Sequence, residues 1–286
     1  MEAAHKYGYF FDPQCPHGGA CRRRSTCAKD GVAGDRHSRD MSHPFDLTGR
    51  TILVTGATSG LGRQTAISVS EMGAQVVING RNEERLADTF SKLKGEGHLA
   101  VSADLAVEET RSAFVNKLPP LDGIAHCAGV TVLHPFKFSD ERRFREVYAA
   151  NVEAPFFVTQ GLFKSKRLKP GASIVFVSSI SPKVGTRGHA IYAGSKAAMH
   201  GISRVLAHEL AASKIRSNCV SPGMVHTEMI AGYANQVSPE LAAIDEARYP
   251  LGYGTPGDVA NAIIFFLAPA SKWITGVDLT MDGGLT

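Results

Sequence analysis

The chain has 286 residues, of which 43% are hydrophobic and 20% are charged, as is typical of a globular protein with a sizeable core. Its formal net charge of +4 is small for this length and its basic residues are spread along the chain, which argues against a nucleic-acid partner. The longest apolar runs, such as residues 260–268, fall far short of the ~20 residues that a membrane span needs, so we expect no membrane partner either.

Residues 1–40 differ from the rest of the chain, because Gly, Arg, Cys and His are interleaved there without apolar periodicity. We predict that they form a disordered leader. They lack the apolar core of a secretory signal, and their five acidic residues argue against a mitochondrial presequence.

Cysteines in this leader raise the hypothesis of a zinc site, formed by Cys15, Cys21 and Cys27 with His17 and His37. Their spacing matches none of the paired Cys-x-x-Cys patterns, so we predict no metal site. The remaining cysteines, Cys127 and Cys219, fall in predicted buried strands, and we interpret them as small apolar residues of a reduced, cytoplasmic protein.

From residue 46 to the end, short runs rich in Val and Ile alternate with longer segments of helical periodicity. The short runs predict strands at residues 51–55, 75–79, 98–102, 122–126, 172–178, 215–220 and 276–281. The longer segments predict helices near residues 61–72, 82–94, 107–118, 139–149, 152–168, 190–213 and 257–267. Strand interiors that are apolar throughout are typical of a sheet covered on both faces. The pattern therefore predicts one α/β domain over residues 46–286, with seven parallel strands and helices on both faces.

A glycine-rich turn joins the first predicted strand to the first predicted helix, and it reads Thr55-Gly56-Ala57-Thr58-Ser59-Gly60-Leu61-Gly62. Its glycines let the backbone approach a pyrophosphate closely, and the amides that begin the next helix favour the phosphate charge. A glycine-rich turn alone is often just a loop. Its place between a strand and a helix predicts a dinucleotide site.

The end of the second predicted strand distinguishes the two nicotinamide dinucleotides, and it reads Val77-Ile78-Asn79-Gly80-Arg81-Asn82. It lacks the carboxylate that commonly binds the adenosine ribose, and Arg81 offers a donor fork suited to a 2′-phosphate. We therefore predict NADP(H) as the preferred cofactor and NAD(H) as the second choice. Two alternatives stay open: Arg81 only faces water, and Arg63 is either a second phosphate partner or a solvated side chain.

Tyr192 and Lys196 are four residues apart in a predicted helix, so both side chains project from one face. A free tyrosine titrates near pH ~10, and a neighbouring cation moves its pKa toward neutrality. Such a pair is common on solvated helix faces. Here Ser179, which follows a predicted strand shortly before the pair, favours a catalytic interpretation.

These motifs, from about residue 46 onward, resemble the short-chain dehydrogenase/reductase family, in its branch with the Thr-Gly-x-x-x-Gly-x-Gly turn and the Tyr-x-x-x-Lys motif. The resemblance implies a Rossmann-like doubly wound fold and an NAD(P)-dependent enzyme that interconverts a carbonyl and a secondary alcohol. It also implies which residues bind the cofactor: Gly56, Thr58, Ser59, Gly60, Leu61, Gly62, Arg81, Asp104, Leu105, Ala128, Gly129, Tyr192, Lys196, Pro222, Gly223, Val225 and Thr227.

By the same resemblance, the catalytic set is Asn151, Ser179, Tyr192 and Lys196. Tyr192 is the expected general acid of the reduction, and Ser179 is expected to donate a hydrogen bond to the substrate oxygen. Lys196 is expected to hold the nicotinamide ribose and to lower the pKa of Tyr192. Asn151 is expected to position a proton-relaying water, with a helix cap as its alternative role.

The chain departs from the family pattern at His126 and Cys127, where the family usually has two asparagines before Ala-Gly. This puts in doubt a network of side chains that stabilises the sheet, but not the reaction. The leader is a second departure, on which the resemblance says nothing.

The substrate is expected to lie under residues 222–256, which we interpret as a lid. A partly apolar pocket is suggested by Met224, Met229, Ile230, Tyr233, Leu241, Ile244 and Tyr249. A 3-oxoacyl-carrier-protein reductase is one specific case, although residues 224–256 hold a single Lys or Arg, Arg248, to meet an acidic carrier. Sugar-derived and small ketones stay open, as does a catalytically silent nucleotide-binding regulatory protein. By resemblance we expect a homotetramer or a homodimer.

Overall fold

The computed structural model describes residues 43–228 and 239–286. The predicted leader with its zinc hypothesis lies outside the described residues, as do Met229, Ile230 and Tyr233 of the predicted lid and the side chain of Leu241. In the described part, no group of three or more His, Cys, Asp or Glu is placed to hold a metal ion. No helix there has the length and apolar character needed to span a bilayer.

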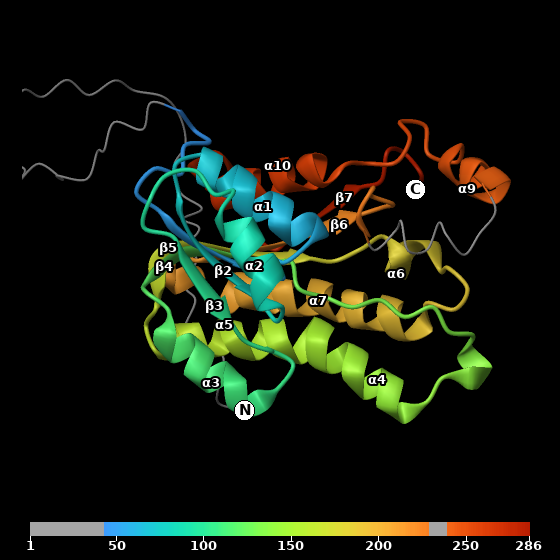
Figure 1. Ribbon diagram of the computed structural model, residues 1–286, viewed down its shortest axis with the longest axis horizontal. Helices are drawn as coiled ribbons and strands as arrows, with labels where there is room; N and C mark the ends of the chain where they lie inside the picture. Colours follow the sequence, from blue (N-terminus) through green and yellow to red (C-terminus); the bar gives the residue numbers. More distant parts are fainter. Residues whose placement is uncertain (1–42, 229–238) are drawn as a thin grey trace, which may run out of the picture. The chain divides into compact units, whose positions relative to one another are not determined.

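The described residues form a seven-stranded parallel sheet in the order β3-β2-β1-β4-β5-β6-β7 (Figure 1). The strands are β1 (Thr51–Thr55), β2 (Gln75–Gly80), β3 (Leu99–Ser102), β4 (Leu121–His126), β5 (Leu168–Val177), β6 (Arg216–Pro222) and β7 (Asp278–Met281). The predicted Rossmann-like fold is therefore confirmed. The strand order reverses between β1 and β4, and ligands of such sheets bind at the carboxyl ends beside that point.

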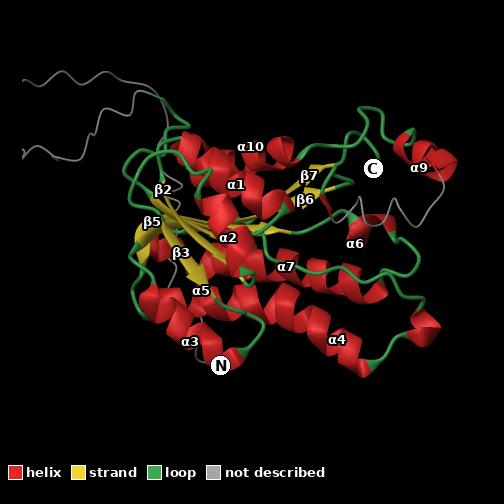
Figure 2. Ribbon diagram, viewed as in Figure 1, coloured by secondary structure: helices red, strands yellow, loops and turns green. Residues whose placement is uncertain are grey.

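Helices cover both faces of the sheet (Figure 2). One side carries α1 (Gly60–Glu71), α2 (Glu83–Phe90) and α10 (Pro256–Leu267). The other side carries α3 (Glu108–Lys117), α4 (Glu141–Tyr148), α5 (Ala154–Lys164) and α7 (Ala190–Glu209). Two short helices, α6 (Ser181–Val184) and α9 (Pro239–Glu246), lie in the connections that follow β5 and β6.

Two apolar cores result, because successive side chains of a strand point to opposite faces. Ile52 and Val54 of β1 belong to the core under α1 and α10, whereas Leu53 belongs to the core under α3, α5 and α7. All three side chains are fully buried, and each such burial contributes about 1.5–3 kcal/mol. The continuous apolar run of β1 is thus explained by the two covered faces.

Several element boundaries differ from the prediction. The helix predicted at residues 152–168 begins only at Ala154, because Ala149–Glu153 form a π-helical turn. The helix predicted at residues 190–213 ends at Glu209, and a short 3₁₀ turn follows before Lys214 adopts the left-handed φ of 57°. The helix predicted at residues 82–94 ends at Phe90. Cys219 lies in a buried strand as predicted, but Cys127 follows β4 instead of lying within it.

Candidate active site

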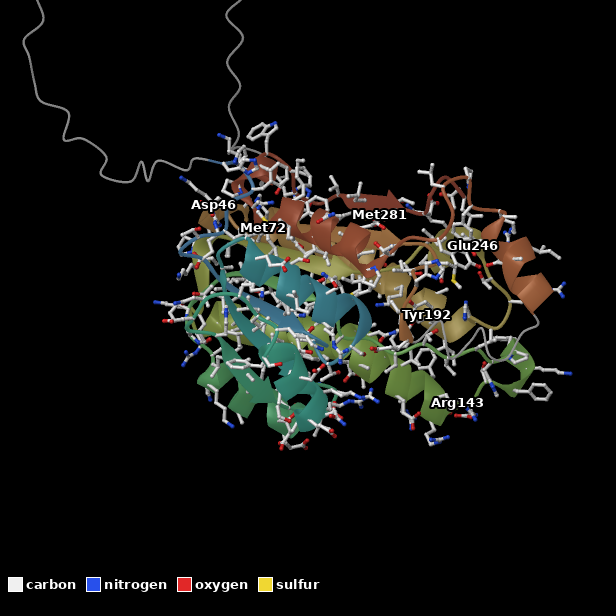
Figure 3. The ribbon with its side chains drawn as sticks, turned by 45° about the horizontal axis from the view of Figure 1, so that its top comes forward. Asp46, Met72, Arg143, Tyr192, Glu246 and Met281 are labelled. Atoms are coloured by element: carbon white, nitrogen blue, oxygen red, sulfur yellow. The ribbon has the colours of Figure 1, made fainter. Side chains whose placement is uncertain are left out.

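A cavity of about 450 Å³ lies at the carboxyl ends of the central strands. Every residue predicted to bind the cofactor lines it, and so does Ser179, whereas Asn151 does not. Figure 3 shows Tyr192 between α4, which carries Arg143, and α9, which ends at Glu246. The predicted residues, which are spread over more than 170 positions from Gly56 to Thr227, therefore surround one hollow.

The glycine turn has no room for a side chain at Gly56 or at Gly62. A Cβ atom at Gly62 would lie 2.2 Å from the carbonyl oxygen of Gly56, and one at Gly56 would lie 2.6 Å from the Cα of Ala128. Gly56 also has a positive φ of 68°. Ser59, which precedes α1 in an extended conformation, makes no side-chain cap to the helix. The first amides of α1 are therefore left for a phosphate, so the turn fits a dinucleotide.

Two arginines lie at the other end of the cavity. The Arg81 side chain is 68% exposed, and its Nη1 lies 3.4 Å from Oδ2 of Asp104. Arg85 of α2 lines the same cavity and was not predicted from the sequence. Asp104 is held by the N–H of Ala106, which donates to its Oδ1 at 3.0 Å.

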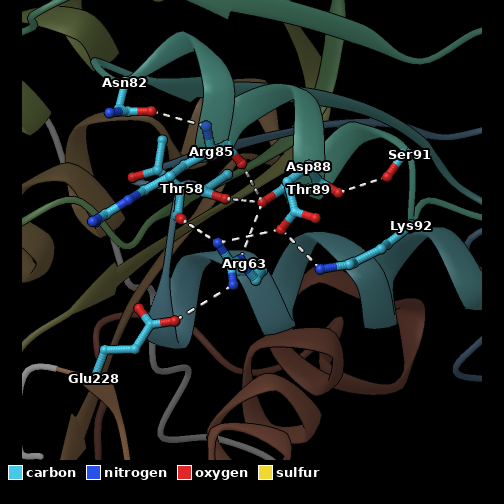
Figure 4. A network of polar contacts seen from close by, with 10 residues as sticks. Thr58, Arg63, Asn82, Arg85, Asp88, Thr89, Ser91, Lys92 and Glu228 are labelled. Atoms are coloured by element: carbon cyan, nitrogen blue, oxygen red, sulfur yellow. Dashed lines mark hydrogen bonds and ion pairs between the residues drawn. The ribbon is translucent and has the colours of Figure 1, made fainter.

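Arg63 is not among the residues that line the cavity, and its side chain is 24% exposed. Its guanidinium donates to the carbonyl oxygen of Thr58 at 2.8 Å and to Oγ1 of Thr89 at 3.3 Å (Figure 4). It also forms ion pairs with Asp88 at 3.5 Å and with Glu228 at 3.4 Å. Arg63 thus ties the glycine turn to α2 and to the residues after β6.

The three predicted catalytic side chains of this cavity lie together. Ser179 is 8% exposed, and its hydroxyl is close enough to Tyr192 to lower the pKa of the phenol. Nζ of Lys196 donates to the carbonyl oxygen of Val177 at 2.8 Å and lies 5.8 Å from the centre of the Tyr192 ring. Burial lowers the pKa of Lys196 to about 8.

The acidity of Tyr192 differs from the expectation. Burial raises the pKa of Tyr192, and the hydrogen bond with Ser179 offsets this rise in part. The Lys196 ammonium donates to the Val177 carbonyl and acts on Tyr192 only through space, 5.8 Å from the ring centre. Ser179 is therefore the neighbouring side chain whose contact lowers the pKa of Tyr192 in the free protein.

Asn151 lies within the π-helical turn and is 2% exposed. Its Oδ1 accepts from the N–H of Val130 at 2.8 Å. Its Nδ2 donates to the carbonyl oxygen of Val130 at 2.9 Å and to Oγ of Ser195 at 3.0 Å. The alternative of a helix cap is wrong, since the side chain instead fastens the segment after β4 to α7.

The structure explains how His126 and Cys127 are accommodated where the family usually has two asparagines. Nε2 of His126 is hydrogen-bonded to Oγ1 of Thr159 at 2.8 Å, and its ring stacks on Phe176 with 5.1 Å between centroids. Burial lowers the pKa of His126 to about 3, so the ring is neutral near pH 7. Burial raises the pKa of Cys127 to about 12, which leaves an unreactive thiol beside the cavity.

The described part of the predicted lid packs partly against the site. Tyr249 is 7% exposed, and a Cβ atom at Gly223 would lie 3.1 Å from its ring. The Tyr253 hydroxyl donates to Oδ2 of Asp245 at 2.8 Å, which holds the end of α9 to the residues before α10. Ile244 is 63% exposed, so it forms no part of a closed pocket here.

Residues 56–286 match the family model of enoyl-(acyl carrier protein) reductases. The chain is 33% identical over 243 residues to a 3-oxoacyl-[acyl-carrier-protein] reductase of Rickettsia felis, which covers 84% of this chain and 98% of that protein. It is 34% identical over 241 residues to carbonyl reductase family member 4 of Danio rerio, which covers 82% of this chain and 98% of that protein.

Solved structures at 30% and 32% sequence identity share the fold of this chain. A structure assigned as an NAD(P)-dependent gluconate 5-dehydrogenase of Beutenbergia cavernae, with bound NADP at low occupancy, aligns with a TM-score of 0.77 and 32% identity over 85% of this chain and 99% of that one. Another, named a short chain dehydrogenase/reductase family protein, has a TM-score of 0.74 and 30% identity over 84% of this chain and 98% of that one. With its glycine turn, its parallel sheet and these relatives, the chain belongs to the short-chain dehydrogenase/reductase family of NAD(P)-dependent oxidoreductases.

Proposed function

We propose that this protein is an NADP(H)-dependent oxidoreductase that interconverts a carbonyl and a secondary alcohol, with Ser179, Tyr192 and Lys196 as catalytic residues. The observation that carries the proposal is their convergence: Ser179, Tyr192 and the buried Lys196 line the same cavity as the glycine turn. A proton donor and a dinucleotide site in one hollow are what carbonyl reduction requires.

The bound cofactor supplies the hydride that reaches the carbonyl carbon, and negative charge then develops on the substrate oxygen. Tyr192 donates its phenolic proton to that oxygen, which becomes the hydroxyl of the product. Ser179 donates a hydrogen bond to the same oxygen and fixes its position. The cation of Lys196, held by the Val177 carbonyl, favours the phenolate that remains on Tyr192.

The preference for NADP(H) is supported by Arg81 and Arg85 at the end of the cavity opposite Tyr192. Both are free to extend toward a 2′-phosphate: the Arg81 side chain is largely exposed, and its contact with Asp104 is a weak surface pair. The relative from Beutenbergia cavernae, whose structure holds NADP, supports the same preference. NAD(H) remains the second choice.

The substrate is a small-molecule carbonyl compound or alcohol. A 3-oxoacyl thioester is supported by the Rickettsia felis relative, and a sugar-derived ketone by the gluconate 5-dehydrogenase. Arg248 of the lid forms an ion pair with Asp245 at 2.9 Å. Because Arg248 is the single Lys or Arg among residues 224–256, the lid offers little positive charge to an acidic carrier protein, and we favour substrates free of one.

Two further features belong to the proposal. We propose a homotetramer or homodimer, since α5 and α7 border an apolar surface hollow of about 610 Å³ that includes Phe163 and Val205, which are 41% and 54% exposed. Light scattering of the purified chain measures this state. A cytoplasmic location is supported by the described cysteines, which are both free.

A spectrophotometric screen tests the function directly. The full chain is mixed with ketones, 3-oxoacyl thioesters, sugar-derived ketones and secondary alcohols, with NADPH and NADH in parallel. We expect cofactor-dependent turnover of at least one class, and faster reduction with NADPH than with NADH. A chain that binds NADPH but oxidises none of it with any compound is instead the silent regulatory protein, and the proposal is then wrong.

A further inference from the structure

The backbone on both sides of Ser179 is fixed to β6. The N–H of Ser178 donates to the carbonyl oxygen of Val220 at 2.7 Å, and the N–H of Ile180 donates to that of Pro222 at 3.1 Å. With the backbone held, the place of the Ser179 hydroxyl depends on rotation about one bond, which has three staggered positions. A contact to the hydroxyl itself is needed to select one of these three positions.

Ser181 makes that contact twice. Its N–H donates to Oγ of Ser179 at 3.0 Å, and Oγ of Ser179 donates to Oγ of Ser181 at 3.0 Å. Ser181 is 9% exposed, so little water competes for either hydroxyl. A hydroxyl has one hydrogen and two lone pairs. Ser181 therefore engages the hydrogen and one lone pair of Ser179, so a phenolate on Tyr192 has to compete with Oγ of Ser181 for the Ser179 hydrogen.

The hydroxyls of the neighbouring Ser178 and Ser195 have other hydrogen-bond partners. Oγ of Ser178 donates to the carbonyl oxygen of Lys196 at 2.9 Å, on the far side of the turn. Oγ of Ser195 donates to the carbonyl oxygen of Tyr192 at 2.7 Å. Neither replaces Ser181 as the acceptor for Ser179.

We propose that Ser181 is a positioning residue of this active site, whose hydroxyl holds Ser179 in the rotamer that faces Tyr192 until a substrate oxygen takes over the Ser179 hydrogen bond. The inference rests on the proposed carbonyl reduction. No covalent bond changes at either serine: the Ser179 hydrogen turns from Oγ of Ser181 to the carbonyl oxygen, while the proton that is transferred comes from Tyr192.

The backbone contact and the hydroxyl contact can be separated experimentally. Ser181→Ala keeps the N–H that donates to Ser179 and removes only the hydroxyl, so the turn persists. Ser181→Thr keeps the hydroxyl. Ser203→Ala is the matched control, because Ser203 and Ser217 form another buried pair of serine hydroxyls, 3.0 Å apart, outside the cavity.

For Ser181→Ala we expect kcat to fall about 3- to 10-fold, the value of one hydrogen bond, with an unchanged KM for NADPH. In alcohol oxidation, the midpoint of the kcat–pH curve moves to lower pH, since the Ser179 hydrogen, no longer accepted by Oγ of Ser181, is free to donate to the phenolate. Ser181→Thr restores both the rate and the midpoint. Ser203→Ala changes neither.

The inference is overturned if Ser181→Ala matches the wild type, if its rate falls without a change in the midpoint, or if Ser181→Thr fails to restore it. These outcomes leave the proposed function intact, because the wild type still turns over. A wild type that is inactive in the whole screen overturns the proposed function and this inference with it.

Discussion

Lys196 of α7 is tied to the last residue of β5, because its ammonium donates to the carbonyl oxygen of Val177 at 2.8 Å. Ser179 follows Val177 by two residues, and Tyr192 precedes Lys196 by one helical turn. This contact therefore joins the strand that carries the serine to the helix that carries the tyrosine. The relative position of all three side chains depends on it.

Tyr192→Phe removes the proposed proton donor while leaving its ring in place. We expect kcat for ketone reduction to fall about 10²- to 10⁴-fold, the usual contribution of a general acid, with little change in NADPH affinity. Single-turnover kinetics and fluorescence titration with NADPH measure the two quantities. Tyr148→Phe on α4 is the control, since Tyr148 does not line the cavity. A Tyr192→Phe variant as fast as this control would remove Tyr192 from its role.

Lys196→Met is expected to raise the stability of the protein and to lower its activity. Lys196 is 5% exposed and burial lowers its pKa to about 8, so its charge at pH 7 is destabilising in the fold. Because the unfolded chain binds the proton more tightly, wild-type stability rises as the pH goes from about 8 toward 10.5. We expect Lys196→Met to raise the free energy of unfolding at pH 7 by about 1–3 kcal/mol and to abolish that rise.

The same substitution is expected to lower kcat, because the cation that favours the phenolate is gone. Urea unfolding at pH 7 and pH 10 measures stability, and turnover measures the loss of activity. A variant that is less stable than the wild type at pH 7 contradicts the account of Lys196 as a costly buried charge.

The strands and the glycine turn could be predicted from the sequence because each depends on a local signal, whereas most other cavity residues were expected only from the resemblance to the family. Apolar runs such as Ile52-Leu53-Val54 mark buried strands, and Gly62 marks a place where a Cβ atom has no room. Arg85 was missed because no local motif marks it; it reaches the cavity only through the angle at which α2 leaves β2.

The polar contacts of the site could not be predicted, since they join residues far apart in sequence. Arg63 looked equally suited to a phosphate or to water, and its contacts with Asp88 and Glu228 appear only in the folded chain. The pKa of Tyr192 was expected to fall because of Lys196. Burial is the larger effect there, and burial cannot be read from a four-residue spacing.

Cofactor choice is expected to depend on Arg81 and Arg85. Arg81→Ala should raise the KM for NADPH about 10-fold and leave the KM for NADH nearly unchanged, because a charge-assisted contact with a phosphate contributes about 1.5 kcal/mol or more. Arg85→Ala should act in the same direction. Steady-state kinetics with both cofactors measure this.

Arg143→Ala on α4 is the matched control for these variants, since Arg143 lies outside the cavity and pairs with Asp140. It should leave both KM values unchanged. Equal losses with NADPH and NADH in Arg81→Ala would assign Arg81 to packing instead of to the 2′-phosphate.

His126 is expected to make the protein sensitive to acid. Its pKa is about 3 in the folded chain and close to the ordinary 6.5 in the unfolded chain, so the unfolded chain binds the proton first as the pH falls. The stability that depends on a neutral His126 is therefore fully present above pH 6.5 and is lost between pH 6.5 and about 3, by up to about 1.4 kcal/mol per pH unit.

His126→Asn, which restores the residue type usual in the family, should make the free energy of unfolding depend less steeply on pH. The free energy of unfolding, measured in urea from pH 7 to pH 4, should fall less steeply in the variant than in the wild type. His208→Asn is the control, because His208 is exposed on α7 and its replacement should leave the slope unchanged. Parallel slopes for the wild type and His126→Asn would mean that His126 keeps an ordinary pKa and that burial does not hold the ring neutral.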